Sequence, residues 1–256
     1  MTLTAGSNSI VLSTLEFDVL WAAERLPEKH VALDVPSPGK THTERAKLVE
    51  EAFAGLAQRG LAEGGRAVPD LADWLSLLAH APVAIDSWVW TDREIAALAV
   101  VSGDQGLLAV VDRAEVWLIP SRATAIADAA VSIAGDMPAG PGRSVSLPTD
   151  VLMKADSGDP QAMITVMVEH GVSLSDAQTL GSMLSGMTTR GQLGAERAPR
   201  GQKRERAGRV VAFHDTDAGR YLYLSRPSSD GRSWSTITPA DNARLAGCVR
   251  ELLDEL

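Results

Sequence analysis

Cysteine is almost missing from this 256-residue chain, in which Cys248 is the single example. One thiol cannot form a disulfide within the chain, which fits a reducing compartment. The five histidines show neither the HExxH motif nor another paired spacing. Because zinc sites need several ligands at set spacings, the sequence predicts no metal site. Dinucleotide-binding and phosphate-binding motifs are also incomplete, so we expect no cofactor.

Long hydrophobic runs and an excess of basic residues are missing as well. No segment approaches the roughly 20 apolar residues that cross a bilayer. The first residues contain neither the basic region nor the apolar stretch of a secretory signal. The formal net charge of −9 repels nucleic acids and anionic membrane surfaces. We therefore expect a cytoplasmic protein that binds no membrane and, in general, no nucleic acid.

Aromatic residues make up only 4% of the chain, and six of them are tryptophans. Hydrophobic residues reach 45%, mainly as alanine, valine and leucine. A chain of this length can bury a sizeable core, as one large domain or two small ones. The composition suits helices packed on a sheet.

The first half of the chain predicts helices followed by strands. Residues 9–13 form a short strand that leads into a helix. Thr41 and Glu44 make a capping box, which satisfies free amides at a helix start, and Gly60 caps the end of that helix. A further helix begins at Pro69. The apolar pattern then predicts strands at 83–90, 95–101, 107–111 and 115–119, followed by a helix that begins at Pro120.

A Pro/Gly-rich linker at 135–148 divides the chain into an N-terminal half, 1–134, and a C-terminal half, 149–256. The C-terminal half is expected to begin with a helical bundle over 149–187. Segment 160–170 would also suit a buried strand, but its flanking Asp159-Pro160 and Gly171 favour a helix. The expected elements are helices at 149–156, 160–170 and 174–187, a mobile loop at 189–208, strands at 209–214, 220–226 and 233–237, and a final helix from Pro239.

The two halves end alike, which indicates an internal repeat. Each closes with strands joined by a turn and then a helix, and a tryptophan, Trp117 or Trp234, lies on the last strand. Pro120 and Pro239 follow these strands. Chance similarity of common units is the alternative. A true duplication predicts two α/β halves that share one sheet and are related by a pseudo-two-fold axis.

Catalytic motifs are also missing. The one compact group of titratable residues, His214-Asp215-Thr216-Asp217, lies at a predicted hairpin tip, where aspartate stabilises turns. A hydrolase built on His214 and Asp215 is an alternative, and it predicts that both side chains line a pocket. Without any further constellation, the sequence predicts no catalytic residue and no enzyme.

Three segments in the N-terminal third carry a family signature. They are Leu15-Glu16-Phe17-Asp18-Val19-Leu20-Trp21, then Pro36-Ser37-Pro38-Gly39-Lys40-Thr41 with Glu44-Arg45, and Phe53-Ala54-Gly55-Leu56-Ala57-Gln58-Arg59-Gly60-Leu61. Together they resemble the EspG family of actinobacterial type VII secretion (ESX) chaperones. The order of elements is similar over nearly the whole chain.

The resemblance implies an α/β (α+β) fold. Its central, mostly antiparallel sheet would be flanked by two helical bundles, with pseudo-two-fold symmetry. It also implies a cytoplasmic chaperone that binds the apolar tip of a helical-hairpin substrate and keeps it soluble for export. The typical partner would be the PPE member of a PE–PPE heterodimer. Such a chaperone would need no cofactor and would be a monomer or a weak homodimer.

The partner surface is expected in the C-terminal half, where five of the seven methionines lie between positions 153 and 187. Flexible methionines suit a surface that accommodates several related apolar tips, and packing in a helical core is the alternative for each of them. The predicted partner-binding residues are Met163, Met167, Met183, Leu184, Met187, Arg209, Phe213, Tyr221 and Tyr223.

A basic segment at 197–209 supports a second hypothesis. Its basic residues are Arg197, Arg200, Lys203, Arg204, Arg206 and Arg209. In an acidic protein, such a segment could attract an acidic partner or a nucleic acid, although a solvated loop is the alternative. An interaction or regulatory domain of this kind predicts strongly salt-sensitive binding.

Overall fold

The computed structural model describes residues 9–155, 159–198, 203–227 and 231–256. The N-terminal half contains β1 (Ile10–Ser13), α1 (Thr14–Ala23), the 3-10 turn η1 (Val31–Leu33), α2 (His42–Gln58), β2 (Ala62–Glu63), β3 (Arg66–Ala67), α3 (Pro69–His80), β4 (Val83–Trp90), β5 (Glu94–Ser102), β6 (Gln105–Asp112), β7 (Glu115–Arg122), η2 (Ala123–Ala125) and α4 (Ile126–Ser132). The C-terminal half contains β8 (Val145–Pro148), α5 (Thr149–Ala155), α6 (Pro160–Glu169), α7 (Leu174–Leu184), β9 (Met187–Arg197), β10 (Glu205–Arg206), β11 (Val211–Thr216), β12 (Gly219–Pro227), β13 (Ser233–Pro239) and α8 (Asn242–Asp254).

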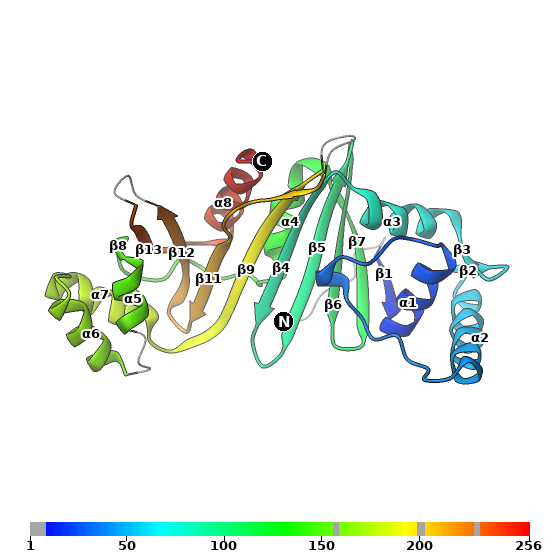
Figure 1. Cartoon of the computed structure of the whole chain (residues 1–256), viewed down its shortest axis with the longest axis horizontal. Coiled ribbons are helices and arrows are strands. Elements are labelled where there is room, and N and C mark those ends of the chain that lie inside the picture. Colours follow the sequence, from blue (N-terminus) through cyan, green and yellow to red (C-terminus); the bar gives the residue numbers. More distant parts are fainter. Residues whose placement is uncertain (1–8, 156–158, 199–202, 228–230) are drawn as a thin grey trace.

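One antiparallel sheet of eleven strands runs through the whole molecule (Figure 1). Its order is β1-β7-β6-β5-β4-β9-β11-β12-β13-β8, and the short β10 pairs with β9. Read outward from β4 and β9, the two sides match, because each consists of four strands of one half and an edge strand that precedes that half's helices. The predicted fold class, a mostly antiparallel sheet with two helical bundles and two matching halves, is confirmed.

The two halves meet where β4 pairs with β9, and we call this pairing the seam. It covers eight antiparallel residue pairs, from Val83↔Arg197 to Trp90↔Arg190. Ile85 and Val89 on β4 share a hydrophobic cluster with Leu193 on β9 and with residues of α4 and α8. The hydrophobic core therefore continues from one half into the other.

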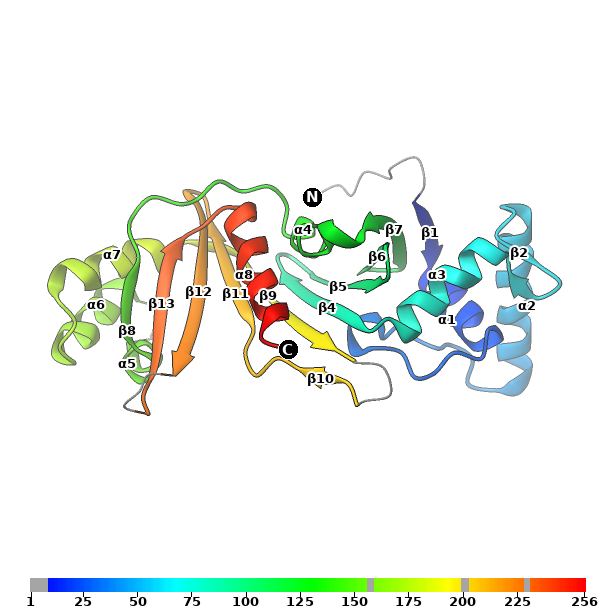
Figure 2. The ribbon, with the colours of Figure 1, turned by 90° about the horizontal axis from the view of Figure 1, so that it is seen from above.

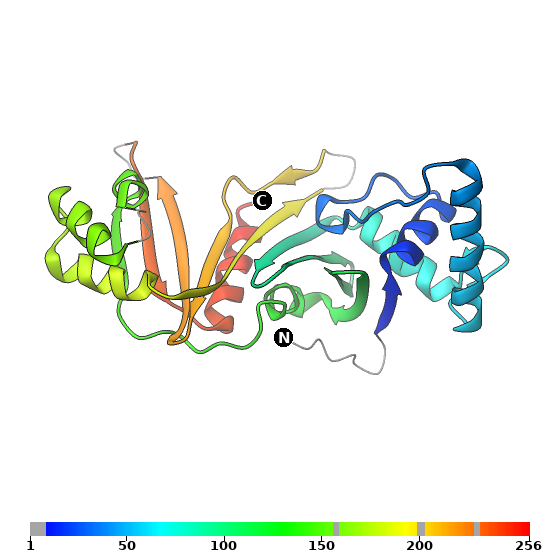
Figure 3. The same ribbon diagram turned by 90° about the horizontal axis from the view of Figure 1, so that it is seen from below.

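Helices cover the two faces of the sheet in different ways. On one face, which we call the paired-helix face, α4 and α8 pack against each other near the middle of the molecule (Figure 2). On the other, the bundle face, α1 to α3 lie at one end of the long axis and α5 to α7 lie at the opposite end (Figure 3). The central strands therefore separate two helical groups on the bundle face.

Local capping signals place the helix starts that the sequence predicted. The Thr41 hydroxyl accepts the Glu44 amide at 3.1 Å, and the Glu44 carboxylate accepts the Thr41 amide at 3.2 Å. Pro69 occupies the first turn of α3. Asp159 caps the segment predicted at 160–170, which is the helix α6 rather than a strand. These starts depend on residues close in sequence, which explains why the sequence predicts them.

The predicted mobile loop at 189–208 is wrong for most of its length. Residues 187–197 form β9, one strand of the seam, and residues 205–206 form β10, while 199–202 lie outside the described residues. Glycines suggested a loop, but a Cβ at Gly191 would overlap the Phe213 ring and one at Gly194 would overlap the Arg206 guanidinium. Both glycines therefore serve long-range packing, which the local sequence does not reveal.

Four element assignments also differ from the prediction. Pro120 and Pro239 lie in β7 and β13 instead of opening helices, and the following helices begin after them. Both prolines extend past the residues that pair with the edge strands β1 and β8, so their missing amides disrupt no ladder there. The third predicted bundle helix ends at Leu184, and the last four linker residues, Val145–Pro148, form β8.

Candidate protein-binding groove

A shallow groove of about 470 Å³ opens on the bundle face, between the end of α7 and the central strands. We call it the front groove. Its lining is mostly apolar and aromatic, with a few polar side chains. The lining residues are Trp90, Leu184, Met187, Arg190, Gly191, Gln192, Ala212, Phe213, His214 and Tyr223.

The floor of the front groove is the sheet itself. Ala212 lies in register between Gln192 on β9 and Tyr223 on β12, so these three side chains point to the same face. Phe213, the next residue of β11, points to the opposite face, where its ring packs across Gly191 and belongs to the cluster beneath α8. Met187, the first residue of β9, is 45% exposed and presents apolar surface. The result is an open apolar depression with a rigid floor.

His214 links β11, in the floor of the groove, to α7, which forms its wall. Its Nε2 lies 2.9 Å from the Met183 carbonyl near the end of α7, and its ring stacks on Tyr221 with 5.2 Å between centroids. Burial lowers the pKa of His214, an effect partly offset by the hydrogen bond to Met183 and by the nearby Asp215 carboxylate. A neutral imidazole that donates from Nε2 satisfies a carbonyl that the helix end leaves free.

The structure separates His214 from Asp215. Both lie within β11 rather than at a hairpin tip, and consecutive strand residues point to opposite faces. His214 lines the groove, whereas the Asp215 carboxylate is buried on the other side, where Arg220 donates to it at 2.7 and 2.9 Å. These two side chains therefore cannot act together as a catalytic pair.

Four of the predicted partner-binding residues lie at the front groove: Leu184, Met187, Phe213 and Tyr223. The Phe213 ring itself is buried in the cluster on the opposite face of the sheet. Four others pack in the core beneath the C-terminal bundle, with Met163 partly buried and Met167, Met183 and Tyr221 buried. Arg209 lies elsewhere and pairs with Glu255 at the end of α8. The methionine cluster is thus mainly a helical core, which was the alternative interpretation.

The sequence missed several lining residues because they lie on β9 or face it. Arg190 and Gln192 fall in the segment predicted as a loop, and Trp90 and His214 are the neighbours of Arg190 across the two adjacent strands. Arg190 is exposed and forms no ion pair with any residue that the structure describes. The groove therefore contains a guanidinium between two ring systems, with no carboxylate of its own.

Most arginines of the basic segment at 197–209 form hydrogen bonds or ion pairs within the protein. Arg204 donates to the Ala81 carbonyl at 2.9 Å, and Arg197 donates to the Leu253 carbonyl at 3.1 Å. Arg206 lies 2.6 Å from Asp86, and Arg209 pairs with Glu255. Lys203 is exposed, and Arg200 lies outside the described residues. The segment is therefore not the solvated basic loop that the sequence suggested.

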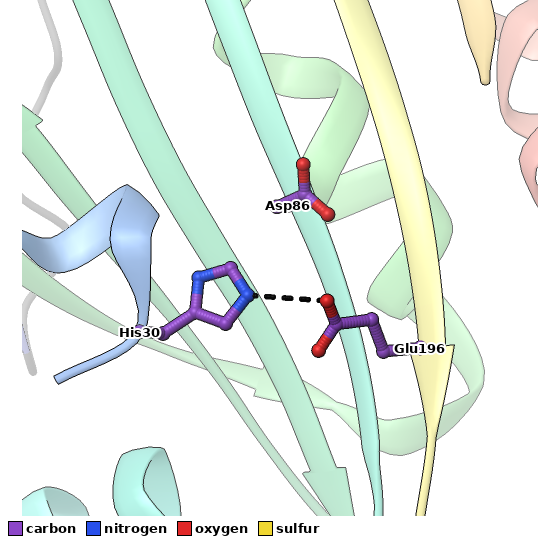
Figure 4. Close-up of side chains that lie close together, drawn as sticks. All are labelled: His30, Asp86 and Glu196. Atoms are coloured by element: carbon purple, nitrogen blue, oxygen red, sulfur yellow. Dashed lines mark ion pairs between the residues drawn. The ribbon is translucent and has the colours of Figure 1, made fainter. Parts of the chain in front are cut away.

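A second cluster of titratable side chains lies at the seam, where His30 (the residue before η1), Asp86 on β4 and Glu196 on β9 converge (Figure 4). Their ligand-type atoms lie within 4.8 Å of one another, as they would around a metal ion. However, Arg206 already bridges the carboxylates, at 2.6 Å from Asp86 and 2.8 Å from Glu196. The cluster is therefore arranged as an ion-pair network.

His30 orients this network. Its Nδ1 accepts the Ala32 amide at 3.1 Å, which leaves the proton on Nε2, 3.5 Å from Glu196. The hydrogen bond from His30, followed by that from Arg206, lowers the pKa of Glu196 to about 2 in spite of its burial. A protonated Nε2 offers no lone pair to a metal, so this neutral tautomer favours the hydrogen bond to Glu196 over metal binding.

Comparisons with known proteins agree with this architecture. The model of the EspG family matches residues 13–251. Among solved structures, the chain is similar to the Mycobacterium tuberculosis type VII secretion system chaperone EspG5 in its complex with the PE25-PPE41 dimer. The TM-score is 0.76 at 15% sequence identity, and the match covers 97% of each chain. No curated protein matches the chain. Within the described residues, no helix is both long and apolar enough to cross a membrane.

Proposed function

Since the chain belongs to the EspG family, we propose that it is a cytoplasmic type VII secretion chaperone whose front groove holds the apolar tip of a helical export substrate. The observation that carries this proposal is the groove itself, an open apolar depression on the central strands. Exposed apolar surface of this kind marks protein-binding sites. The EspG5 complex with the PE25-PPE41 dimer supports a PE–PPE-like dimer as the partner.

The chemistry of the groove suggests how such a partner is held. Leu184, Met187 and Tyr223 would contact an apolar tip, while Arg190 would pair with a carboxylate beside that tip. Because the groove is small, a stable interface of about 1,200–2,000 Å² would extend onto the neighbouring strands and helices. Binding lowers the concentration of exposed substrate, so that capping needs neither a nucleotide nor covalent chemistry.

The hypothesis of a regulatory domain that uses the basic segment at 197–209 is less well supported. Four of its arginines contact groups within the protein: Arg197, Arg204, Arg206 and Arg209. Releasing them would leave Asp86 and Glu196 buried without their cation, which is costly. The front groove needs no such rearrangement.

The test is co-expression with PE–PPE pairs from the same genome, followed by size-exclusion chromatography with light scattering. We expect a stoichiometric complex that keeps an otherwise insoluble pair in solution. Leu184→Asp and Tyr223→Asp should each weaken it by about tenfold or more, because a charge would be buried against the apolar tip. Arg190→Glu should weaken it through charge repulsion.

Leu174→Asp is the matched control, since Leu174 is an exposed leucine of α7 that does not line the groove. Equal loss of binding in this control would indicate damage to the bundle rather than to the site. Complexes that survive all the groove substitutions would place the partner elsewhere on the molecule.

A further inference from the structure

The repeat makes α4 and α8, the last helix of each half, comparable. These two helices cover the strands of their halves differently. α4 packs against all four strands of its half, β4 to β7, whereas the strand contacts of α8 are mainly with β9 and β11. A second groove of about 520 Å³ consequently lies on the paired-helix face, between α8 and the strands β12 and β13. We call it the back groove. It is lined by Leu224, Arg226, Trp234, Thr236, Arg244, Gly247, Cys248 and Glu251.

Because α4 and α8 cover their strands differently, Trp117 and Trp234 differ in exposure. They occupy matching strands, β7 and β13, but Trp117 packs against the cluster beneath α4 and donates its indole N–H to Glu115 at 3.1 Å. Trp234 is 38% exposed, and its indole N–H has no acceptor among the described residues. One copy of the repeat partly buries its tryptophan against a helix, and the other presents it in a groove.

Two of the three charged side chains that line the back groove are arginines, Arg226 and Arg244, and the third is Glu251. Arg244 is exposed and has no ion pair within the described part of the chain, although it lies in the first turn of α8, where the helix dipole disfavours a cation. Arg226 makes only a long contact of 3.6 Å with Glu251, and both side chains are more than half exposed. Such a surface pair contributes little stability. Neither Arg226 nor Arg244 therefore stabilises the fold appreciably through an ion pair.

We propose that the back groove binds an acidic peptide segment of a partner protein. Its carboxylates would pair with Arg226 and Arg244, while an apolar side chain would lie against Trp234 and Leu224. The charge complementarity is local, because two arginines and an unpaired indole donor face one glutamate in a chain of net charge −9. The back groove lies on the opposite face from the front groove, so both can be occupied together.

Fluorescence polarisation with two labelled peptides tests this directly. The probes are Glu-Leu-Glu-Leu-Glu and its basic counterpart Lys-Leu-Lys-Leu-Lys, each titrated with the full chain at low and at physiological salt. We expect the acidic peptide to bind preferentially and more weakly as salt rises. Arg226→Glu, Arg244→Glu and Trp234→Ala should each weaken its binding by about tenfold.

Arg122→Glu is the matched control, because Arg122 is an exposed arginine at the end of β7 and has the same charge change. The proposal is overturned if the acidic peptide does not bind, if the basic peptide binds equally well, or if Arg122→Glu weakens binding as much as Arg244→Glu. Formation of the complex with a PE–PPE pair should be unchanged in Arg244→Glu, which keeps this test separate from that of the front groove.

Discussion

At the scale of single residues, the ion-pair network at the seam joins segments that are distant in sequence. Glu196 on β9 faces His30 beside η1, and Arg206 on β10 links Glu196 to Asp86 on β4. Asp86 is 2% exposed and Glu196 is 8% exposed, so both carboxylates depend on the Arg206 guanidinium. The sequence placed Arg206 in a loop and therefore could not predict the network.

The low pKa of Glu196, about 2 in the folded chain against 4.5 for the free side chain, predicts an acid-dependent loss of stability. Because the pKa is lowered, this stabilisation is complete above pH 4.5 and is lost as the pH falls toward 2. We expect Glu196→Gln to cost about 1–3 kcal/mol at pH 7, less than the full pKa shift implies, because Arg206 is partly exposed.

Urea unfolding at pH 7, 4 and 3 measures this effect. The difference between the wild type and Glu196→Gln should narrow as the pH falls. Glu169→Gln, at an exposed position on α6, is the control and should leave both the stability and its pH dependence unchanged. A difference that stays constant across this range would contradict the assignment.

At the scale of elements, β9 shows why some of the fold could be predicted and some could not. Helices such as α2 and α3 carry their own start signals, and β4 to β7 carry their own apolar pattern. β9 instead owes its conformation to the strands on either side. Its residues Gly191 and Gly194 pack under side chains from β11 and β10. The front groove was missed in part for the same reason.

Because β9 packs closely against its neighbouring strands, adding one methyl group at Gly191 should lower the stability of the fold. Gly191→Ala would push the Phe213 ring away from the strand, and overpacking of this kind typically costs about 1–3 kcal/mol. Gly208→Ala is the control, since nothing lies within 4 Å of the added carbon. Thermal unfolding of both variants compares them. Equal melting temperatures would contradict the close packing of Phe213 on Gly191.

At the scale of the whole molecule, the two halves share one sheet and one core cluster. The division into 1–134 and 149–256 follows the repeat, but Ile85 and Leu193 belong to the same cluster across the seam. The segment between the halves also packs on the C-terminal half, since Gly140 donates its amide to the Arg220 carbonyl. The repeat was visible in the sequence, whereas the seam, which needs β9, was not.

The shared core predicts that neither half folds alone. Cutting the chain between Gly142 and Arg143, both exposed, gives fragments 1–142 and 143–256 without removing any strand. We expect the fragments to co-purify as one folded complex when co-expressed, because the seam and its cluster re-form. Expressed separately, each should aggregate, since it exposes a long unpaired strand. Two soluble, folded monomers by circular dichroism and light scattering would contradict this expectation.

The pairing of β4 with β9 also bears on how such a chain could arise. A polypeptide with the elements of one half would have β4 as an unpaired edge strand. A second copy, related by a two-fold rotation, would pair with this edge as β9 does here. Fusion of two such genes would convert a contact between molecules into one within a molecule. Each copy would then be free to diverge. In the present chain, α3 packs on β5 and β6 of the first copy, whereas β9 and β11 of the second copy border the open front groove.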